Sequence, residues 1–290
     1  MAQSHILVGA AAAPQPVIRT IGTGDLKAAL RDGWQDFAAM PSHAIFLAII
    51  YPIVGIVLLQ LTFGYAILPF LFPLAAGFAL IGPIAALGLY ELSRRREAGL
   101  DTSAGHALDV LHSPSIGAIA ALGCLLVAIF VAWLALAHAI YIANFGYAMP
   151  ASFDAFVSDL LTTNAGWTLI VVGNIVGFVF AVVALTLSVV SFPLLLDREV
   201  GAATALTTSL RLVAKNPRTM ALWGLIVAVL LLIGSIPAFL GLAVVIPVLG
   251  HTTWHLYRRA IDAGDSPKAE FREPRREKRY AADFPASLFK

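Results

Sequence analysis

Two histidines four residues apart, His251 and His255, form the pair in this sequence whose spacing best fits a metal site. Residues at i and i+4 share one face of a helix, and imidazole nitrogens are common ligands of zinc and of haem iron. No cysteine or carboxylate motif accompanies the pair, whereas Trp254 and Tyr257 stand beside it. Such residues are typical of the aromatic belt of a membrane helix. We therefore expect an interfacial belt here, with no metal ion and no cofactor.

The remaining histidines do not complete a haem or haem–copper centre. Such a centre needs several histidines that meet at one depth of the membrane. His43 and His138 are the other histidines in or beside long apolar runs, and the topology derived below places His138 at the opposite end from His251. The sequence also lacks the nucleophile, zinc-protease, phosphate-loop and dinucleotide motifs. These absences predict a protein that is not an enzyme and has no catalytic residue.

Asn174 is the most distinctive polar residue within an apolar run. It lies between Gly173 and Gly177, whose Gly-x-x-x-Gly spacing lets two helices approach closely, and its amide could hydrogen-bond across that contact. Prolines recur in the descending helices, at Pro83, Pro193 and Pro247. Each proline removes a backbone donor and can kink its helix, which frees carbonyl groups. These six residues are candidates for a helix-packing seam, which we favour, or for a solute path.

The composition indicates the elements that must position these residues. Of 290 residues, 59% are hydrophobic and only 12% are charged, and the mean hydropathy is +0.85. The apolar residues fall in long runs, which is typical of transmembrane helices and excludes a soluble globular fold. The net charge of +2 is too small to indicate a nucleic-acid partner. The sequence therefore predicts an integral membrane protein.

Six membrane spans follow from the apolar runs and one turn signal. A span needs about 20 apolar residues. The last run, 220–249, is too long for one span and contains Gly234-Ser235-Ile236-Pro237, which favours a turn. The predicted spans are about 44–63, 66–92, 115–143, 167–196, 219–233 and 238–257. No ionisable residue lies deep in a span, which counts against ion-coupled transport but leaves a passive pathway open.

The distribution of basic residues predicts the orientation. All 19 lysines and arginines lie before residue 44, in 93–114, in 197–218 or after residue 257, so six spans place every basic segment on one side. By the positive-inside rule, both termini are then cytoplasmic. We expect a flexible leader at 1–24, a six-helix membrane domain at 25–260 and a disordered basic cytoplasmic tail at 261–290.

Three amphipathic segments, ending at Pro41, Pro114 and Pro217, precede three hairpins as an internal repeat. In the first, Leu26, Leu30, Trp34 and Phe37 share a face opposite Lys27, Arg31, Gln35 and Asp36. In the second, the apolar residues are Ala104, Ala107, Leu108 and Leu111; in the third, Leu206, Leu210 and Val213. We expect these segments in the interface plane, apolar face towards the lipid. The predicted fold is an all-α membrane protein: six transmembrane helices as three hairpins, each preceded by a cytoplasmic-side amphipathic helix.

Arginines in and between these segments are candidate contacts for lipid head groups. Basic side chains beside a membrane attract anionic lipids. The candidates are Arg31, Arg94, Arg95, Arg96, Arg211, Arg258 and Arg259. We accordingly expect the phospholipid bilayer, anionic lipids and other inner-membrane proteins as partners.

Several loose motifs resemble a known family. They are Trp34-Gln35-Asp36-Phe37, the stretch from Gly82-Pro83 to Gly88-Leu89-Tyr90-Glu91, Ser191-Phe192-Pro193 and Val245-Ile246-Pro247. Over roughly residues 20–260 the chain resembles a prokaryotic integral membrane protein family of unknown function, some of whose members carry a cytochrome c oxidase label. The resemblance implies a six-helix protein of the bacterial inner membrane and no assigned activity.

Three functions remain open. The leading hypothesis is a non-catalytic inner-membrane protein that organises lipid or partner proteins, because the basic segments gather on one side of the membrane. The first alternative is a small-solute permease or channel that uses the proline-kinked helices. The second alternative, a respiratory-complex accessory or assembly protein, is implied by the family resemblance.

Overall fold

A computed structural model of the chain describes residues 16–40, 67–147, 149–237, 239–264 and 266–269. The predicted first span at 44–63, together with Pro41 and His43, lies outside these residues. So do most of the predicted leader and most of the tail. Within the described part the chain is mainly helical, which confirms the expected all-α class in its general form.

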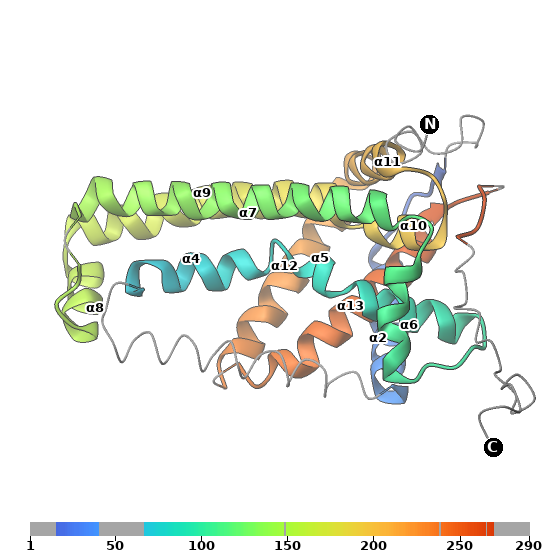
Figure 1. Ribbon diagram of the computed structural model, residues 1–290. Coiled ribbons are helices and arrows are strands. Elements are labelled where there is room, and N and C mark those ends of the chain that lie inside the picture. The colour runs from blue at the N-terminus through green and yellow to red at the C-terminus, as the bar shows by residue number, and fades with distance from the viewer. Residues whose placement is uncertain (1–15, 41–66, 148, 238, 265, 270–290) are drawn as a thin grey trace, which may run out of the picture.

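Two long antiparallel helices form the body of the fold (Figure 1). Helix α7 (Ile116–Phe145) has 30 residues and α9 (Asn164–Ser188) has 25, and α8 (Phe153–Thr162) connects their far ends. At about 1.5 Å per residue, α7 is about 45 Å long, more than a membrane core of about 30 Å. The hydroxyls of Ser152 and Thr163 accept backbone N–H groups at the starts of α8 and α9. These caps set where the two helices begin.

The second apolar run, predicted as one span at 66–92, is not a continuous helix. It is divided into α4 (Leu68–Phe78), α5 (Gly82–Ala85) and α6 (Leu87–Glu97). The break falls before Gly82-Pro83, because proline has no N–H to donate and disfavours helical geometry in the residue before it. Helix α4 packs against α7, where the Trp133 indole donates a hydrogen bond of 2.9 Å to the Pro73 carbonyl.

Three helical segments among the described residues are long and apolar enough to cross a membrane: α7, 164–197 and α12 (Pro217–Ser235). The segment 164–197 comprises α9 and the short α10 (Ser191–Asp197). After α12 the chain turns back into α13 (Leu242–Ala260), which packs against it. Only the first half of α13 is continuously apolar. The six predicted spans therefore reduce to three clear ones in the described part.

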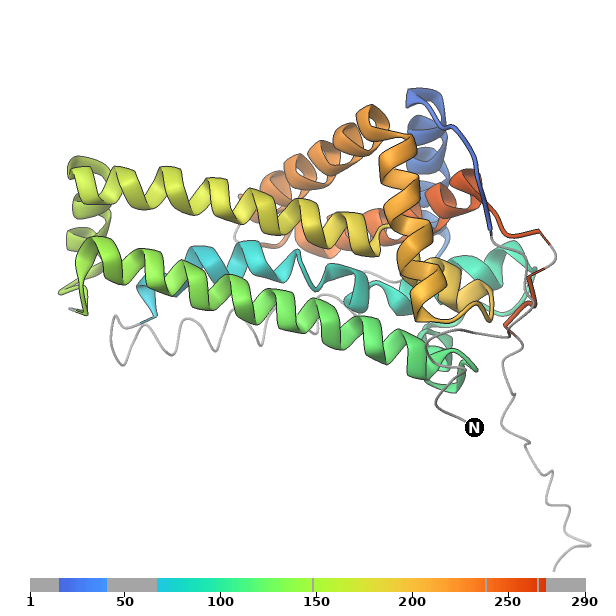
Figure 2. The same cartoon turned by 90° about the horizontal axis from the view of Figure 1, so that it is seen from above.

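Short elements lie across one end of the α7–α9 pair. Helices α2 (Thr23–Ala39) and α11 (Ala202–Lys215) and the 3-10 helix η1 (Ala104–His112) gather there with α6, α10 and the second half of α13. Helix α11 is viewed along its axis in Figure 1 and lengthwise in Figure 2, so it runs across α7 and α9. Two short antiparallel strands, β1 (Val17–Ile18) and β2 (Ile261–Asp262), pair beside α11. We call this region the polar end.

Helix α2 packs closely along α13 at the polar end. A Cβ atom on Gly33 would lie 2.2 Å from Oγ1 of Thr252, so only glycine fits at this crossing. Leu26 and Ala29 of α2 are buried in the same contact region, whereas large apolar side chains along α7 and α9 are exposed. Tight packing is therefore concentrated at the polar end, and the long helices present apolar surface outward, as lipid-facing helices do.

Candidate functional site

A buried carboxylate at the polar end, that of Asp36, joins three helices. Its Oδ2 accepts hydrogen bonds from the Ser93 hydroxyl at 2.5 Å and from Nε2 of His255 at 2.8 Å. Its Oδ1 accepts one from Nη1 of Arg96 at 2.6 Å. Nδ1 of His251 lies 2.8 Å from the Ser93 oxygen. These five residues, contributed by α2, α6 and α13, are named the Asp36 cluster.

Helix periodicity places the members of the Asp36 cluster. Ser93 and Arg96 are three residues apart on α6, and His251 and His255 are four apart on α13, so each pair faces the same neighbour. Gly250 brings α13 against α6, because a Cβ there would lie 2.4 Å from a methyl carbon of Leu89. The cluster is thus formed where glycines let three helices meet.

The electrostatics of the cluster favour one charged carboxylate beside a neutral histidine. Burial acts to raise the pKa of Asp36, but hydrogen bonds from His255 and Ser93 and the two nearby imidazoles outweigh it, and the pKa lies below its usual value. Burial lowers the pKa of His251 to about 4, against the attraction of Asp36. His251 belongs to the polar half of α13, outside the three apolar helices. At neutral pH, Asp36 is therefore ionised and paired with Arg96.

The geometry of Ser93 differs from that of a hydrolase nucleophile. Its hydroxyl donates to Asp36, and its side chain is buried with that of His251. A nucleophilic serine instead donates to a histidine and faces a substrate pocket. Within the described ranges, no group of three or more His, Cys, Asp or Glu side chains is placed to hold a metal ion. The arrangement can fasten helices together, and its polar groups already have partners inside the protein.

The predicted aromatic belt around His251 and His255 is wrong in its placement. His251, Trp254 and Tyr257 are buried under α2 and α6 rather than exposed at a membrane surface, and His255 is largely covered. The Trp254 indole donates to Glu97 at 3.0 Å, and the Tyr257 hydroxyl donates to Asp197 at 2.7 Å. The indole N–H and the phenol hydroxyl therefore find carboxylate partners at the ends of α6 and α10, which pack against α13.

A second set of polar contacts ties α13 to α6 and α10. Arg258 lies 2.8 Å from Glu97 and 3.5 Å from Asp197, the acceptor of the Tyr257 hydroxyl. Burial, followed by the Asp197 carboxylate, raises the pKa of Tyr257, so its hydroxyl stays protonated. The contacts add to the Asp36 cluster and hold the second half of α13 in place.

Most of the predicted lipid-binding arginines instead contact carboxylates of the protein. Five of the seven make such ion pairs, at distances of 2.5 to 3.1 Å: Arg94 with Glu91, Arg95 with Asp109, Arg96 with Asp36, Arg258 with Glu97, and Arg259 with Asp32. Arg31 and Arg211 are exposed. Asp36 and Glu91 were not predicted as partners, because the sequence placed Asp36 on the polar face of its helix and Glu91 at the end of a predicted span. The spacing of Glu91 from Arg94 and Arg95, at i+3 and i+4, was the signal available.

The Gly173–Asn174–Gly177 stretch makes one close helix contact. A Cβ on Gly177 would lie 3.0 Å from the Trp133 ring of α7, whereas one on Gly173 would meet nothing within 4 Å. The amide of Asn174 donates to the Ile170 carbonyl of its own helix at 2.7 Å and is exposed. Its hydrogen bond is therefore local, and close approach to α7 occurs at Gly177.

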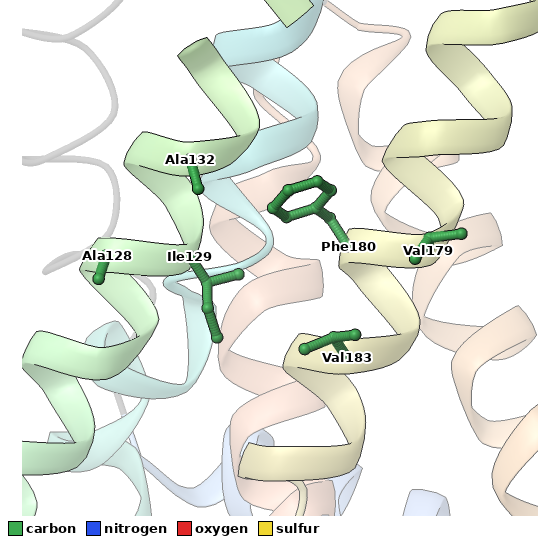
Figure 3. Close-up of a pocket in the computed structure, with 6 residues that line it drawn as sticks. All are labelled: Ala128, Ile129, Ala132, Val179, Phe180 and Val183. Atoms are coloured by element: carbon green, nitrogen blue, oxygen red, sulfur yellow. The ribbon is translucent and has the colours of Figure 1, made fainter. Parts of the chain in front are cut away.

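The candidate prolines do not gather around a pathway. Pro83 lies in the first turn of α5, Pro193 in α10 and Pro247 inside α13. A pocket of about 320 Å³ lies instead between α7 and α9 (Figure 3). Its lining is entirely apolar: Ala128, Ile129, Ala132, Val179, Phe180 and Val183. Neither Asn174 nor any of the three prolines lines this pocket, so the structure does not join them into a polar path.

Comparison with known proteins supports the membrane assignment for the middle of the chain. Residues 71–197 are similar to a family described as "Predicted integral membrane protein (DUF2189)". This region holds α7, α9, α10 and the α6 residues of the Asp36 cluster, while α2 and α13 lie beyond it. No curated protein and no solved structure matches the chain. The similarity agrees with an integral membrane protein and carries no activity.

Proposed function

We propose that this integral membrane protein is non-catalytic and organises anionic lipid at the cytoplasmic face of a bacterial inner membrane. The observation that carries the proposal is that α2 and α11 lie at the polar end (Figure 1) and that their basic residues Lys27, Arg31 and Arg211 are exposed. Basic residues held at the level of the head groups attract anionic phospholipid.

Helix α2 presents a mixed basic and aromatic stripe. Lys27, Arg31 and Trp34 follow one another at i, i+4 and i+7 and are all exposed, with Trp34 54% exposed. The opposite face, with Leu26 and Ala29, is buried against the protein. Tryptophan beside lysine and arginine is the composition of an interfacial helix face. Of the predicted lipid-facing residues, Leu26 is instead covered by protein, whereas Trp34 is exposed.

Helix α11 has the same organisation. Ala205, Ser209 and Leu212 are buried, whereas Leu210 and Arg211 are exposed. Arg218, the second residue of α12, is exposed as well. Because α12 is apolar enough to span the membrane and begins directly after α11, the basic residues lie at the level of the lipid head groups.

The orientation of the proposal rests on the positive-inside rule. The basic segments of the described chain gather at the polar end, and α8 at the other end of α7 and α9 contains no lysine or arginine. The polar end is therefore cytoplasmic.

The experiment compares lipid enrichment around matched variants. The full chain is extracted in polymer-bounded native discs, and co-purified lipids are quantified against the bulk membrane. Arg31→Gln with Arg211→Gln is expected to lose most of the enrichment in phosphatidylglycerol and cardiolipin. A control pair, Arg19→Gln with Lys268→Gln, removes the same charge from exposed positions outside α2 and α11 and should retain it. Equal enrichment in both pairs would overturn the proposal.

A permease is the second candidate, favoured by the break between α4 and α5. Discontinuous helices at membrane depth form solute sites in many transporters. The apolar pocket between α7 and α9 would suit an apolar solute rather than an ion. Reconstituted vesicles test this candidate: flux altered by Phe180→Ala supports it, and vesicles that remain tight to apolar solutes dismiss it.

A further inference from the structure

We propose that η1 is inserted into the cytoplasmic leaflet, with Leu108 and Leu111 among the acyl chains of phospholipid beside the start of α7. The inference depends on α7 crossing the membrane, and not on the binding of anionic lipid by α2 and α11. In this proposal the exposed apolar edge of η1 is covered by phospholipid, whose acyl chains contact the two leucines.

The 3-10 geometry of η1 separates its residues into three edges. With three residues per turn, side chains three apart lie above one another. Leu108 and Leu111 form one edge and are 67% and 65% exposed. Val110, which is buried, lies on a second edge together with Ala107, and His106 and Asp109 lie on a third. An α-helical reading of the sequence groups Ala107 with the leucines, whereas the structure separates them.

The inward edge is fixed tightly against α6. A Cβ on Gly88 would lie 3.0 Å from Cβ of Ala107 and 3.1 Å from its carbonyl oxygen, so the two backbones nearly touch. Runs of 3-10 helix longer than three or four residues are uncommon, yet η1 has nine residues. Its close packing on α6 holds this geometry and sets the direction of the leucine edge.

The third edge is tied down by a charged network. His106 lies with Nδ1 2.6 Å from Asp109 and Nε2 3.1 Å from Asp101, and Nη1 of Arg95 lies 3.1 Å from Asp109. Arg95 therefore pairs with Asp109, and His106 lies between Asp109 and Asp101. This network holds the third edge in place and so helps to fix the direction of the leucine edge.

Continuity with α7 identifies lipid as the occupant of the leucine edge. Leu111 precedes Ile116, the first residue of α7, by five positions, and Ile116 and Leu125 are also exposed. The start of a spanning helix lies at the membrane surface. Two exposed leucines this close to the membrane surface enter the leaflet, as the apolar side chains of an interfacial helix do.

The test measures the surroundings of single nitroxide labels in the full chain, reconstituted in phosphatidylcholine nanodiscs. In a Cys124→Ala background, labels are placed by Leu108→Cys, Leu111→Cys, His112→Cys and Val127→Cys. The label at 127 is the hydrocarbon reference on α7, and the label at 112 is an exposed control on another edge of η1. Collision with oxygen reports the acyl region, and collision with a water-soluble nickel complex reports the aqueous phase.

The proposal expects oxygen-to-nickel collision ratios at 108 and 111 close to that at 127 and several-fold above that at 112. Ratios at 108 and 111 equal to that at 112 would overturn it. Protection from both reagents would also overturn it, because a protein surface would then cover the leucines. Phosphatidylcholine carries no net charge, so the outcome is independent of the anionic-lipid proposal.

A second measurement tests His106 as a positioning residue. His106→Ala, with the label at 111, is expected to shift the collision ratio towards the aqueous value while far-ultraviolet circular dichroism is unchanged. His112→Ala is the matched control and should leave the ratio at 111 as in the parent. An unchanged collision ratio at 111 in His106→Ala would show that His106 does not position the leucine edge.

Discussion

The carboxylate of Asp36 accepts a hydrogen bond from His255 at 2.8 Å, although 219 residues separate them in the sequence. This contact fastens the N-terminal helix α2 to the C-terminal half of α13. Ser93 and Arg96 of α6 bind the same carboxylate, so the cluster joins α2, α6 and α13. The basic side chains of α2 that are proposed to bind lipid are carried by one of these joined helices.

The Asp36 cluster should contribute measurably to stability. Asp36→Asn keeps the side-chain volume but loses the charge that pairs with Arg96, and we expect a loss of about 1–3 kcal/mol in the free energy of unfolding. Thermal unfolding in detergent measures the change. Gln35→Ala, an exposed neighbour on α2, should cost under about 0.5 kcal/mol. Equal midpoints for the two variants would contradict the assigned role of the cluster.

The pH dependence of stability should report His251. Its pKa is about 4 in the folded protein, below the model value of 6.5, so between these values the unfolded chain binds the additional proton. Stability should therefore fall as the pH is lowered from about 6.5 to about 4. His251→Gln should flatten this part of the profile, whereas His112→Gln, at an exposed position, should leave it unchanged. An equal loss of stability between about pH 6.5 and about pH 4 in both variants would show that His251 is not the group responsible.

Asp36 acts at lower pH and in the same direction. Because its folded pKa lies below the model value of 3.8, it stabilises the protein above that value and loses this contribution as the pH falls through the folded pKa. Unfolding below about pH 4 should therefore be less steep in Asp36→Asn than in the parent. The same loss of stability below about pH 4 in the variant and the parent would show that Asp36 does not contribute to the pH dependence.

The helix crossing at Gly33 offers a matched pair of glycines. Gly33→Ala places a methyl group on Thr252 and should cost about 1–3 kcal/mol through overpacking. Gly24 lies on the same helix with nothing within 4 Å of its added Cβ, so Gly24→Ala should be neutral or stabilising by up to about 1 kcal/mol. Urea or thermal unfolding distinguishes them, and destabilisation by both would contradict the crossing.

Gly177 and Gly173 provide a second matched pair, on α9. Gly177→Leu must displace the Trp133 ring, and an overpacked contact of this kind costs about 1–3 kcal/mol. Gly173→Leu adds a side chain in open space and should have little effect. Unfolding midpoints in the same detergent compare the two. A larger loss at Gly173 would place the helix contact elsewhere.

The long apolar helices could be predicted from the sequence because a run of apolar residues is a local signal. The predicted spans at 115–143 and 219–233 differ by only one or two residues at each end from α7 and α12. The break before Gly82-Pro83 carried the same kind of signal as Gly234–Pro237, but the run at 66–92 had the length of a single span and so was left intact. Local signals therefore predicted α7 and α12 closely but missed the divisions within 66–92 and within 167–196.

The contacts at the polar end could not be predicted in this way, because they join residues that are far apart in the sequence. Amphipathicity placed Asp36 on the polar face of its helix, opposite the leucines, yet Asp36 is 4% exposed and is buried against α6 and α13. The partners of Asp36 lie 57 to 219 residues away, and periodicity within one helix holds no information about them. The carboxylate partners of Arg96, Arg258 and Arg259 were missed for the same reason, whereas Glu91, the partner of Arg94, lies on the same helix at a spacing that indicated the pair.

Native mass spectrometry of the gently extracted full chain tests the central claim, that the polar end binds anionic lipid through α2 and α11. The account predicts parent protein carrying bound phosphatidylglycerol or cardiolipin, with most of that lipid lost in the double variant Arg31→Gln, Arg211→Gln and retained in Arg19→Gln, Lys268→Gln. Parent protein without anionic lipid, or equal occupancy in both double variants, would contradict it.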